Sequence, residues 1–269
     1  DYNTALYSCS SNTFNTDWRV RSPSVNVVYY DPAVDYKPWK MEGMSDASFT
    51  AARSNPKSGT TGYSHLRDLT GFSYEIWTDD RGYSGSRPER GTNQNATSTA
   101  NDEVDLWDKH TKYTFQQNAI TSDDEVLVEV TTYAPDSTGL NPTTVTTTLT
   151  GTGTHEELGG GAVASRTIAE AQQNVANWYQ YARKRSYVTK GALAAVVDGK
   201  SGFRYGLSLI NYYTSVFKEV PARDVTDFAS HNTALLNAMA AYEWRGAGTP
   251  LRKGLGRVGK YFDDDLLDK

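Results

Sequence analysis

Three short acidic clusters are the first residues in this sequence whose chemistry suggests metal binding: Asp79-Asp80, Asp123-Asp124 and Asp263-Asp264-Asp265. Carboxylate oxygens are preferred ligands of Ca²⁺. A calcium-binding EF loop, however, alternates its oxygen donors around a turn glycine, and none of the three clusters has that spacing. We therefore interpret the clusters as solvated charges in turns.

The sequence shows no set of residues with the spacing of a catalytic motif. We looked for paired carboxylates, a Ser/His/Asp order, a zinc-binding HExxH helix and phosphate loops. The glycine-rich stretch Gly246-Ala247-Gly248-Thr249 lacks the lysine of a phosphate loop. None of the four histidines has a visible partner in the sequence. We therefore predict no catalytic residues and expect that the protein is not an enzyme.

Composition limits the class of protein. The 269 residues include 18 Tyr and 6 Trp and carry a formal charge of −5, which argues against a disordered chain and against nucleic-acid binding. The sequence has no apolar run of the length that spans a bilayer. No signal peptide is visible, although a mature or truncated chain would lack one. Cys9 is the single cysteine, so it pairs with a cysteine outside this segment or is a free thiol.

The clearest periodic pattern runs from Ile168 to Val196. Apolar residues recur there every three or four positions, which predicts one long amphipathic helix with Trp178 on its buried face. Thr167 and Glu170 form a capping box at its start, and Asp198-Gly199 ends it. The polar residues of the opposite face are expected to meet water: Gln173, Asn177, Gln180, Arg183, Lys184 and Lys190.

The segments after this helix predict an α/β framework. Phe203–Ile210 alternates aromatic and aliphatic residues and predicts a strand. A second amphipathic helix is expected from Thr226 to Tyr242, and a third begins after the glycine-rich loop, with Pro250 in its first turn. Helix, strand, helix, loop and helix is the order of elements in an α/β sheet fold.

Residues 1–160 are predicted to be β-rich, and residues 161–269 to form the helical and sheet framework. The boundary is placed at the flexible joint Gly159-Gly160-Gly161. An exposed loop is expected at 83–101, which is rich in Gly, Ser, Asn and Thr. The predicted strands of the first region are 25–30, 71–78, 113–115, 125–133 and 143–152.

Aromatic side chains are the candidate binding residues. Pro38-Trp39 predicts an extended anchor, because Trp39 buries a large area while proline fixes its approach. Two interpretations remain for the N-terminal aromatics: core packing, or a platform on which carbohydrate stacks. Trp39, Tyr36 and Trp77 are the residues that we select as possible surface contacts.

Three segments resemble the PilY type of type IV pilus tip and biogenesis proteins, which carry an N-terminal von Willebrand factor A-like domain. Residues 173–185, QNVANWYQYARKR, are similar to the family's "QNFANWYSYYRTR" helix. Residues 248–252, GTPLR, with 258–262, VGKYF, resemble its "GGTPLRxAL…VGxYF" segment. Residues 26–39, NVVYYDPAVDYKPW, resemble its "N-YYNPxVxYxPW" segment. The matches come in family order and span most of the chain.

The resemblance implies an α/β fold of the von Willebrand factor A-like, Rossmann-like type, incomplete in this segment and carrying a large β-rich insertion. A-type domains hold a divalent cation with an Asp-x-Ser-x-Ser loop, a threonine and a further aspartate. Thr249 matches that threonine; its alternative role is to cap the following helix. Asp46-Ala47-Ser48-Phe49-Thr50 mimics the first loop, but no apolar strand precedes it. We therefore expect that this chain is a segment of a larger protein and that Mg²⁺ or Ca²⁺ binds only to the full-length protein.

The resemblance also implies function. A PilY-like protein is exported through the periplasm and outer membrane to the pilus tip, caps minor pilins, supports pilus extension and twitching motility, and contacts host or abiotic surfaces. Its partners here would be minor pilins and the C-terminal remainder of the polypeptide. Two alternatives remain: a secreted carbohydrate-binding β module that uses exposed Tyr and Trp, and a secreted hydrolase with an unrecognised site.

The cation site gives a first testable prediction. Mg²⁺ requires near-octahedral oxygen ligation with one or two carboxylates, and the Thr249 hydroxyl supplies neither the charge nor the number of ligands. Residues 1–269 alone should bind Mg²⁺, Mn²⁺ or Ca²⁺ weakly or not at all at this loop. A longer chain with an Asp-x-Ser-x-Ser loop should bind, as measured by calorimetry. Tight binding by residues 1–269 that Thr249→Ala removes would contradict this expectation and redirect attention to the Asp46 segment.

Overall fold

The computed structural model describes residues 23, 26–57, 65–79, 108–133, 142–151, 154–155, 158, 165–198, 202–210, 218–221, 226, 228–242 and 250–265. These residues combine helices with antiparallel sheets, so the chain is a mixed α/β protein. It divides into two compact units. Unit 1 is Asp1–Lys37, Asp46–Ser54 and His65–Arg185, and unit 2 is Pro38–Ser45, Asn55–Ser64 and Ser186–Lys269. These units do not test the domain boundary predicted at residue 160, which stays a prediction.

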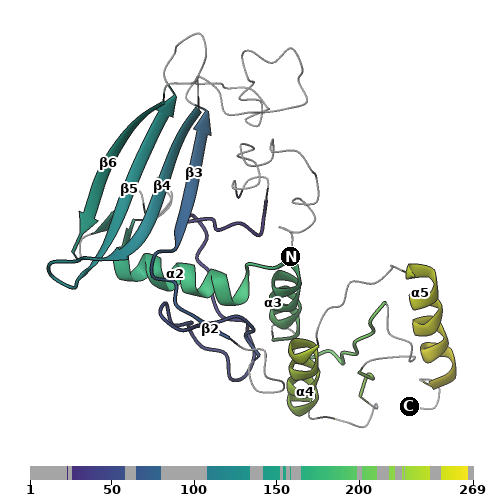
Figure 1. Cartoon of the computed structure of the whole chain (residues 1–269). Coiled ribbons are helices and arrows are strands. Elements are labelled where there is room, and N and C mark those ends of the chain that lie inside the picture. The colour runs from purple at the N-terminus through teal and green to yellow at the C-terminus, as the bar shows by residue number, and fades with distance from the viewer. Residues whose placement is uncertain are drawn as a thin grey trace, which may run out of the picture. The chain divides into compact units, whose positions relative to one another are not determined.

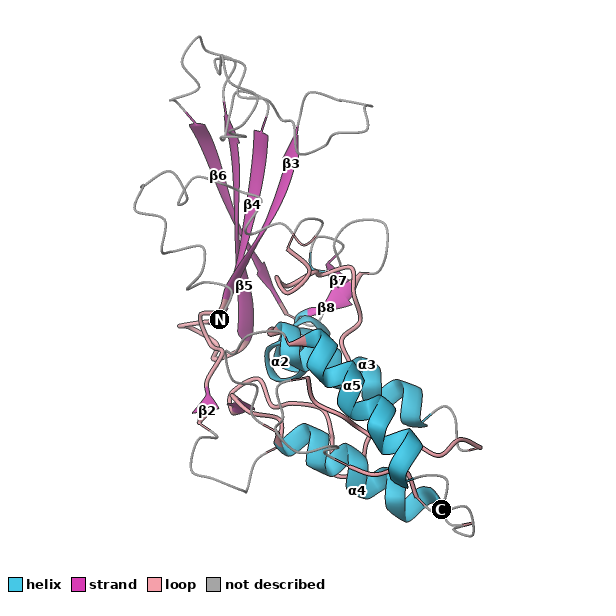
Figure 2. Cartoon of the chain, turned by 90° about the vertical axis from the view of Figure 1, so that its right-hand side faces the viewer, coloured by secondary structure: helices cyan, strands magenta, loops and turns pink. Residues whose placement is uncertain are grey.

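A four-stranded antiparallel sheet dominates unit 1 (Figure 1). Consecutive strands are neighbours, which is the simplest way to pair antiparallel strands. Figure 2 views the sheet nearly edge-on, where the strands cross as those of a twisted sheet do. Among the described residues all strand pairs are antiparallel. In order across the sheet, the strands are β3 (Ser73–Asp79), β4 (Asp108–Gln117), β5 (Asp124–Tyr133) and β6 (Pro142–Thr150).

Alternation along the strands creates one apolar and one polar face of the sheet. Tyr74 pairs with Tyr113, and Phe115 pairs with Val126, which places all four on the same face. These four side chains are buried. The predicted strands 71–78, 113–115, 125–133 and 143–152 are thus confirmed in position. The opposite face carries ion pairs, such as Lys112–Glu129 at 3.5 Å.

An aromatic cluster on the apolar face forms the centre of unit 1. The Tyr30 ring lies 4.8 Å from that of Tyr74 and 5.7 Å from that of Trp178, both in edge-to-face contacts. Tyr30 is buried, and Trp178 is half-buried. The strand predicted at 25–30 is wrong over its described part, because Asn26 starts a turn: its backbone carbonyl accepts from the Tyr29 N–H at 2.8 Å.

Helix α2 (Ile168–Tyr181) crosses the sheet at the end where β4 and β5 join, and it contacts β5 (Figure 1). The predicted capping box is confirmed: the Thr167 hydroxyl accepts from the Glu170 N–H at 3.2 Å, and the Glu170 carboxylate accepts from the Thr167 N–H at 2.9 Å. Two short antiparallel pairs complete the described strands of unit 1: β1 (Ala52–Arg53) with β2 (Leu66–Arg67), and β7 (Thr154–His155) with β8 (Arg166–Thr167).

The single long helix predicted from Ile168 to Val196 is wrong. Helix α2 ends at Tyr181 and α3 (Arg185–Asp198) begins after a short bend. The bend contains no Gly or Pro. Instead, the Arg183 guanidinium donates to the Tyr179 carbonyl and, at 2.7 Å, to the Ser54 carbonyl. The Arg183 side chain thereby satisfies a backbone carbonyl in the last turn of α2. Its contact with Ser54, 129 residues earlier in the chain, fixes the position of the break.

Unit 2 contains α3, α4 (Phe228–Ala241) and α5 (Leu251–Lys260), followed by a π-helical turn, η4 (Tyr261–Asp265) (Figure 2). The helices predicted at 226–242 and after Pro250 are confirmed, and α3 ends at Asp198 as predicted. The strand predicted at 203–210 is wrong. Among the described residues, this segment forms one isolated antiparallel bridge, between Leu207 and Lys218, and is not part of a sheet.

Trp39 is an anchor of unit 2. Its side chain is 5% exposed and its ring lies 5.8 Å from that of Tyr187 on α3, in an edge-to-face contact. Gly191, one turn further along α3, lets the indole approach: a Cβ added there would lie 2.9 Å from Trp39 Cδ1 and 3.2 Å from Nε1. A glycine inside a helix costs about 1 kcal/mol relative to alanine, but at position 191 it makes room for a buried tryptophan.

No helix in the described part of the chain is both long enough and apolar enough to span a membrane.

Gly191 supplies a stability prediction. In an exposed helix, Gly→Ala stabilises by about 1 kcal/mol. At Gly191 the added methyl group collides with the Trp39 ring, and overpacking a core costs about 1–3 kcal/mol. Gly191→Ala should therefore lower the free energy of unfolding, measured in urea, by about 1 kcal/mol.

Gly256→Ala on α5 is the matched control, since nothing lies within 4 Å of a Cβ at that position. It should stabilise by about 0.5–1 kcal/mol. Equal stabilisation by both substitutions would show that Trp39 does not pack on Gly191.

Candidate functional site

A stripe of buried amide side chains on α2 is the most elaborate polar arrangement in unit 1. Asn174, Asn177 and Gln180 lie three residues apart on one helical face, and they are 3%, 2% and 5% exposed. Buried polar groups require hydrogen-bond partners. Each of these amides finds them on loop segments that precede α2 by more than a hundred residues.

Asn174 binds the segment 30–36. Its Oδ1 accepts from the Tyr36 N–H at 2.8 Å, while Nδ2 donates to the Val34 carbonyl at 2.9 Å and to the Tyr30 hydroxyl at 3.0 Å. One amide therefore satisfies both backbone groups and a buried phenol of a segment that has no strand partner of its own among the described residues.

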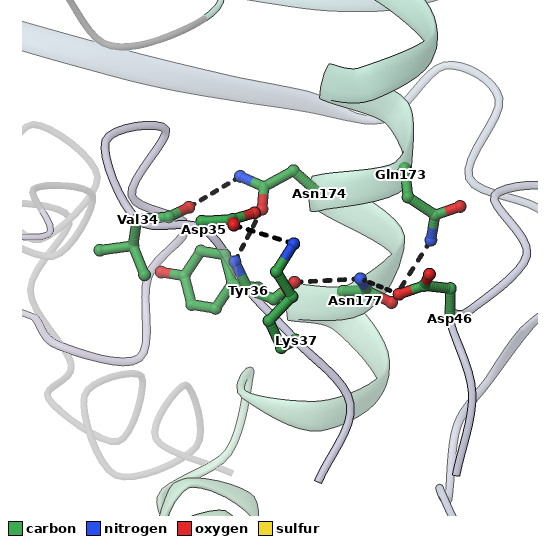
Figure 3. A network of polar contacts seen from close by, with 8 residues as sticks. All are labelled: Val34, Asp35, Tyr36, Lys37, Asp46, Gln173, Asn174 and Asn177. Carbon is green, nitrogen blue, oxygen red and sulfur yellow. Dashed lines mark hydrogen bonds and ion pairs between the residues drawn. The ribbon is translucent and has the colours of Figure 1, made fainter. Parts of the chain in front are cut away.

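Asn177 joins two segments, as Figure 3 shows. Its Nδ2 donates to the Tyr36 carbonyl at 3.0 Å and to the Asp46 carboxylate at 2.9 Å, and its Oδ1 accepts from the Ala47 N–H at 2.9 Å. Gln180 extends the stripe, because its Oε1 accepts from the Arg53 N–H at 2.8 Å. We call Asn174, Asn177 and Gln180 the amide stripe.

The amide stripe corrects the expectation that Asn177 and Gln180 face water. Lys190 corrects it in unit 2 as well: it is 4% exposed, and its ammonium donates to the carbonyls of Ala240 at 2.8 Å and Tyr242 at 2.7 Å, at the C-terminal end of α4. A cation there is favoured by the partial negative charge of the helix end. In both places the polar side chains satisfy backbone groups of other segments, which periodicity does not reveal.

The structure places the predicted aromatic contacts in different surroundings. Trp39 is buried in unit 2, so its ring serves packing there. Tyr36 is half-buried in unit 1, and its hydroxyl accepts from the Asp31 N–H at 3.1 Å. Burial raises the pKa of the Tyr36 hydroxyl to about 12, against the opposing effect of that hydrogen bond. Trp77 lies in β3, but its side chain is outside the described residues, as is the candidate cation ligand Thr249.

In the segment that mimics a cation loop, the side chains of Asp46, Ser48 and Thr50 are exposed, and the Ala47 backbone is paired with the amide stripe. One Asp46 oxygen accepts from Asn177, and the hydroxyls of Ser48 and Thr50 lie 3.4 Å apart. Among the described residues, no three His, Cys, Asp or Glu side chains form a group that would hold a metal ion.

Each unit contains a cavity among its described residues. The cavity in unit 2 has a volume of about 240 Å³ and is bordered by charges of both signs, from Lys40, Glu42 and Asp198. Near it, the Lys57 ammonium donates to Asn237 Oδ1 at 2.6 Å. These exposed charges give the cavity no preference for one sign of ligand.

The cavity in unit 1 lies at the joined end of β4 and β5, beside α2, and we call it the hairpin pocket. Its volume is about 200 Å³. The apolar part of its wall is formed by Phe49 and Phe115. The polar part is formed by Thr50, Thr70, Gln116, Gln117, Asp124 and Gln172. In the sequence Asp124 is one of a pair of charges expected in a turn, and no sequence pattern joins it to Gln172.

Comparison with protein-family models, with curated proteins and with solved structures finds no match for this chain.

The amide stripe supplies a second stability prediction. Asn177→Ala leaves the Ala47 N–H and the Tyr36 carbonyl without their partner, and each unsatisfied buried group costs about 1–3 kcal/mol. The free energy of unfolding should fall by about 2–4 kcal/mol in urea titrations.

Gln172→Ala, on the same helix, is the matched control. The Gln172 side chain makes no hydrogen bond within the described residues, and alanine is the better helix former. Its effect should stay within about 0.5 kcal/mol. Similar losses from both variants would mean that the stripe contributes only helix propensity.

Proposed function

We propose that this chain is a non-enzymatic segment of a pilus tip adhesin and assembly factor of the PilY type. In this proposal it acts outside the cell at the pilus tip, caps minor pilins and mediates attachment to host or abiotic surfaces. The sequence supports the proposal through its three family-like segments, which occur in family order.

The observation that carries the proposal is the contact between two of these segments. Residues 26–39 and 173–185 are far apart in the chain, yet Asn174 and Asn177 of the second bind Tyr30, Val34 and Tyr36 of the first. The residues that carry the resemblance are therefore the residues that hold the two segments together.

The third segment also contributes a core residue. Tyr261, in the stretch 258–262, is 3% exposed, and its hydroxyl accepts from the Val220 N–H at 3.0 Å. The von Willebrand factor A-like framework with a β-rich insertion is the finer fold that goes with the proposal. The four-stranded sheet belongs to the insertion in this scheme, because A-type frameworks are Rossmann-like.

The exposed surface of the sheet suits contact with a partner. Strand β6 is rich in threonine, and most of its described side chains are exposed. Thr131 and Thr144 share a hydrogen bond of 3.0 Å across β5 and β6. Threonine favours strand conformation without needing burial, so such a strand presents hydroxyl groups to a partner while it stays in register.

Deletion of the gene in its own host tests the proposal. Because a tip protein supports pilus extension, the deletion should lower the number of surface pili in electron micrographs and reduce attachment. Antibodies against residues 1–269 should label pilus ends. A gene copy with Gln172→Ala should restore piliation, whereas one with Asn177→Ala, which lacks a member of the amide stripe, should restore it poorly. Normal piliation in the deletion strain would contradict the assembly role.

A further inference from the structure

The hairpin pocket has the size and lining of a site for a small polar molecule. Its volume of about 200 Å³ lies below the roughly 300–1,000 Å³ of pockets for drug-sized ligands. A single small ring with polar substituents fits such a volume.

Hydrogen-bond acceptors dominate the polar lining. Gln116 Nε2 donates to the Glu125 carboxylate at 2.8 Å, and Gln117 Nε2 donates to the Ser122 carbonyl at 3.1 Å. Both amide oxygens therefore remain as acceptors. The side chains of Asp124 and Gln172 make no hydrogen bonds within the described residues, so a carboxylate and a whole amide add further capacity. This lining suits a ligand that carries several hydroxyl donors.

The charge of the lining excludes other classes of ligand. It contains one carboxylate, Asp124, and no Lys, Arg or His. Phosphate and carboxylate ligands would meet repulsion without a compensating cation. A metal ion would find a single charged ligand, whereas Mg²⁺ and Ca²⁺ require six or more oxygens, several of them charged in a protein site.

The aromatic part of the wall suits a ring with C–H groups on its face. The half-buried Phe49 ring packs edge-to-face on the fully buried Phe115 ring, with centroids 5.5 Å apart. Phe115 is fixed in β4, and its position orients Phe49 at the pocket. A pyranose sugar combines hydroxyl groups at its rim with a C–H surface, which matches a wall that is polar on one side and aromatic on the other.

The frame of the pocket is held in place before any ligand binds. Within the β4–β5 turn, Asn118 Nδ2 donates to the second Glu125 oxygen at 2.9 Å, and the Asn118 N–H donates to the Asp123 carbonyl at 2.7 Å. On the other side, the Gly71 N–H donates to the Phe115 carbonyl at 2.7 Å, which fixes the turn that carries Thr70. Preorganisation of this kind lowers the entropic cost of binding.

We propose that the hairpin pocket binds a single neutral pyranose ring, with Gln172 and Asp124 as the principal hydrogen-bonding side chains. The binding site is thus distinct from the aromatic platform of Trp39, Tyr36 and Trp77 expected from the sequence. The inference rests on the pocket and goes beyond the pilus proposal. Gene deletion and sugar binding therefore test two different claims.

Saturation-transfer difference NMR on residues 1–269 tests the inference, because it detects weak ligands. The probes are D-glucose, D-galactose, D-mannose and N-acetyl-D-glucosamine. At least one should receive saturation most strongly at its ring C–H protons, with millimolar affinity. Gln172→Ala and Asp124→Ala should each weaken that binding about tenfold or more. Asp123→Ala, which removes a neighbouring exposed carboxylate outside the pocket, should leave it unchanged.

Three outcomes would overturn the inference. The first is the absence of saturation transfer to all four sugars. The second is sugar binding that persists in both Gln172→Ala and Asp124→Ala, which places the ligand elsewhere. The third is preferential binding of ethylammonium or inorganic phosphate that Asp124→Ala alters. If Asp124→Ala fails to fold, Asp124→Asn takes its place, since it keeps the shape of the side chain and removes its charge.

Discussion

The pairing of the α2 amide stripe with loop backbone is the interaction on which unit 1 depends. The segments 30–37 and 46–53 run beside α2 largely without regular strand pairing, and backbone N–H and C=O groups removed from water must be paired. Asn174, Asn177 and Gln180 supply those partners from a rigid helix. A planar amide suits the task, because it donates and accepts at once and so serves both kinds of backbone group.

The amide stripe also positions the loop segment that packs against the sheet. By fixing the segment around Tyr30, Asn174 holds the ring that packs against Tyr74 of β3 and against Trp178 of the same helix. Burial raises the pKa of the Tyr30 hydroxyl, and the hydrogen bond from Asn174 opposes that shift. Sheet, loop and helix thus share one core. Residues of two of the three segments on which the pilus proposal rests, around Tyr30 and Asn174, lie in that core.

The sequence correctly predicted structural features that depend on residues close together in the chain. The Thr167–Glu170 capping box correctly predicted the start of α2, and the strand predicted at 125–133 coincides with β5. Predictions failed where a distant partner decides. The helix break depends on Arg183 reaching Ser54, which no periodicity contains. Phe203–Ile210 alternates like a strand, but its described residues have only one bridging partner. The sequence does not predict the hairpin pocket. Asp124 and Gln172 both line it only because of the strand register and the way α2 packs beside the sheet.

Different sides of helix α2 carry side chains that stabilise the fold and a side chain that is available to a ligand. Successive residues turn by about 100° around a helix, so Gln172 lies about 160° around the helix from Asn174, about 140° from Asn177 and about 80° from Gln180. Groups on the stripe have their hydrogen bonds taken by protein partners, whereas the Gln172 amide, on another side of the same helix, has none among the described residues. A buried amide that is fully paired contributes to stability and offers nothing to a ligand. An unpaired amide in a cavity wall contributes less to stability but can form hydrogen bonds with a ligand. For this reason the hairpin pocket is a better candidate binding site than the amide stripe.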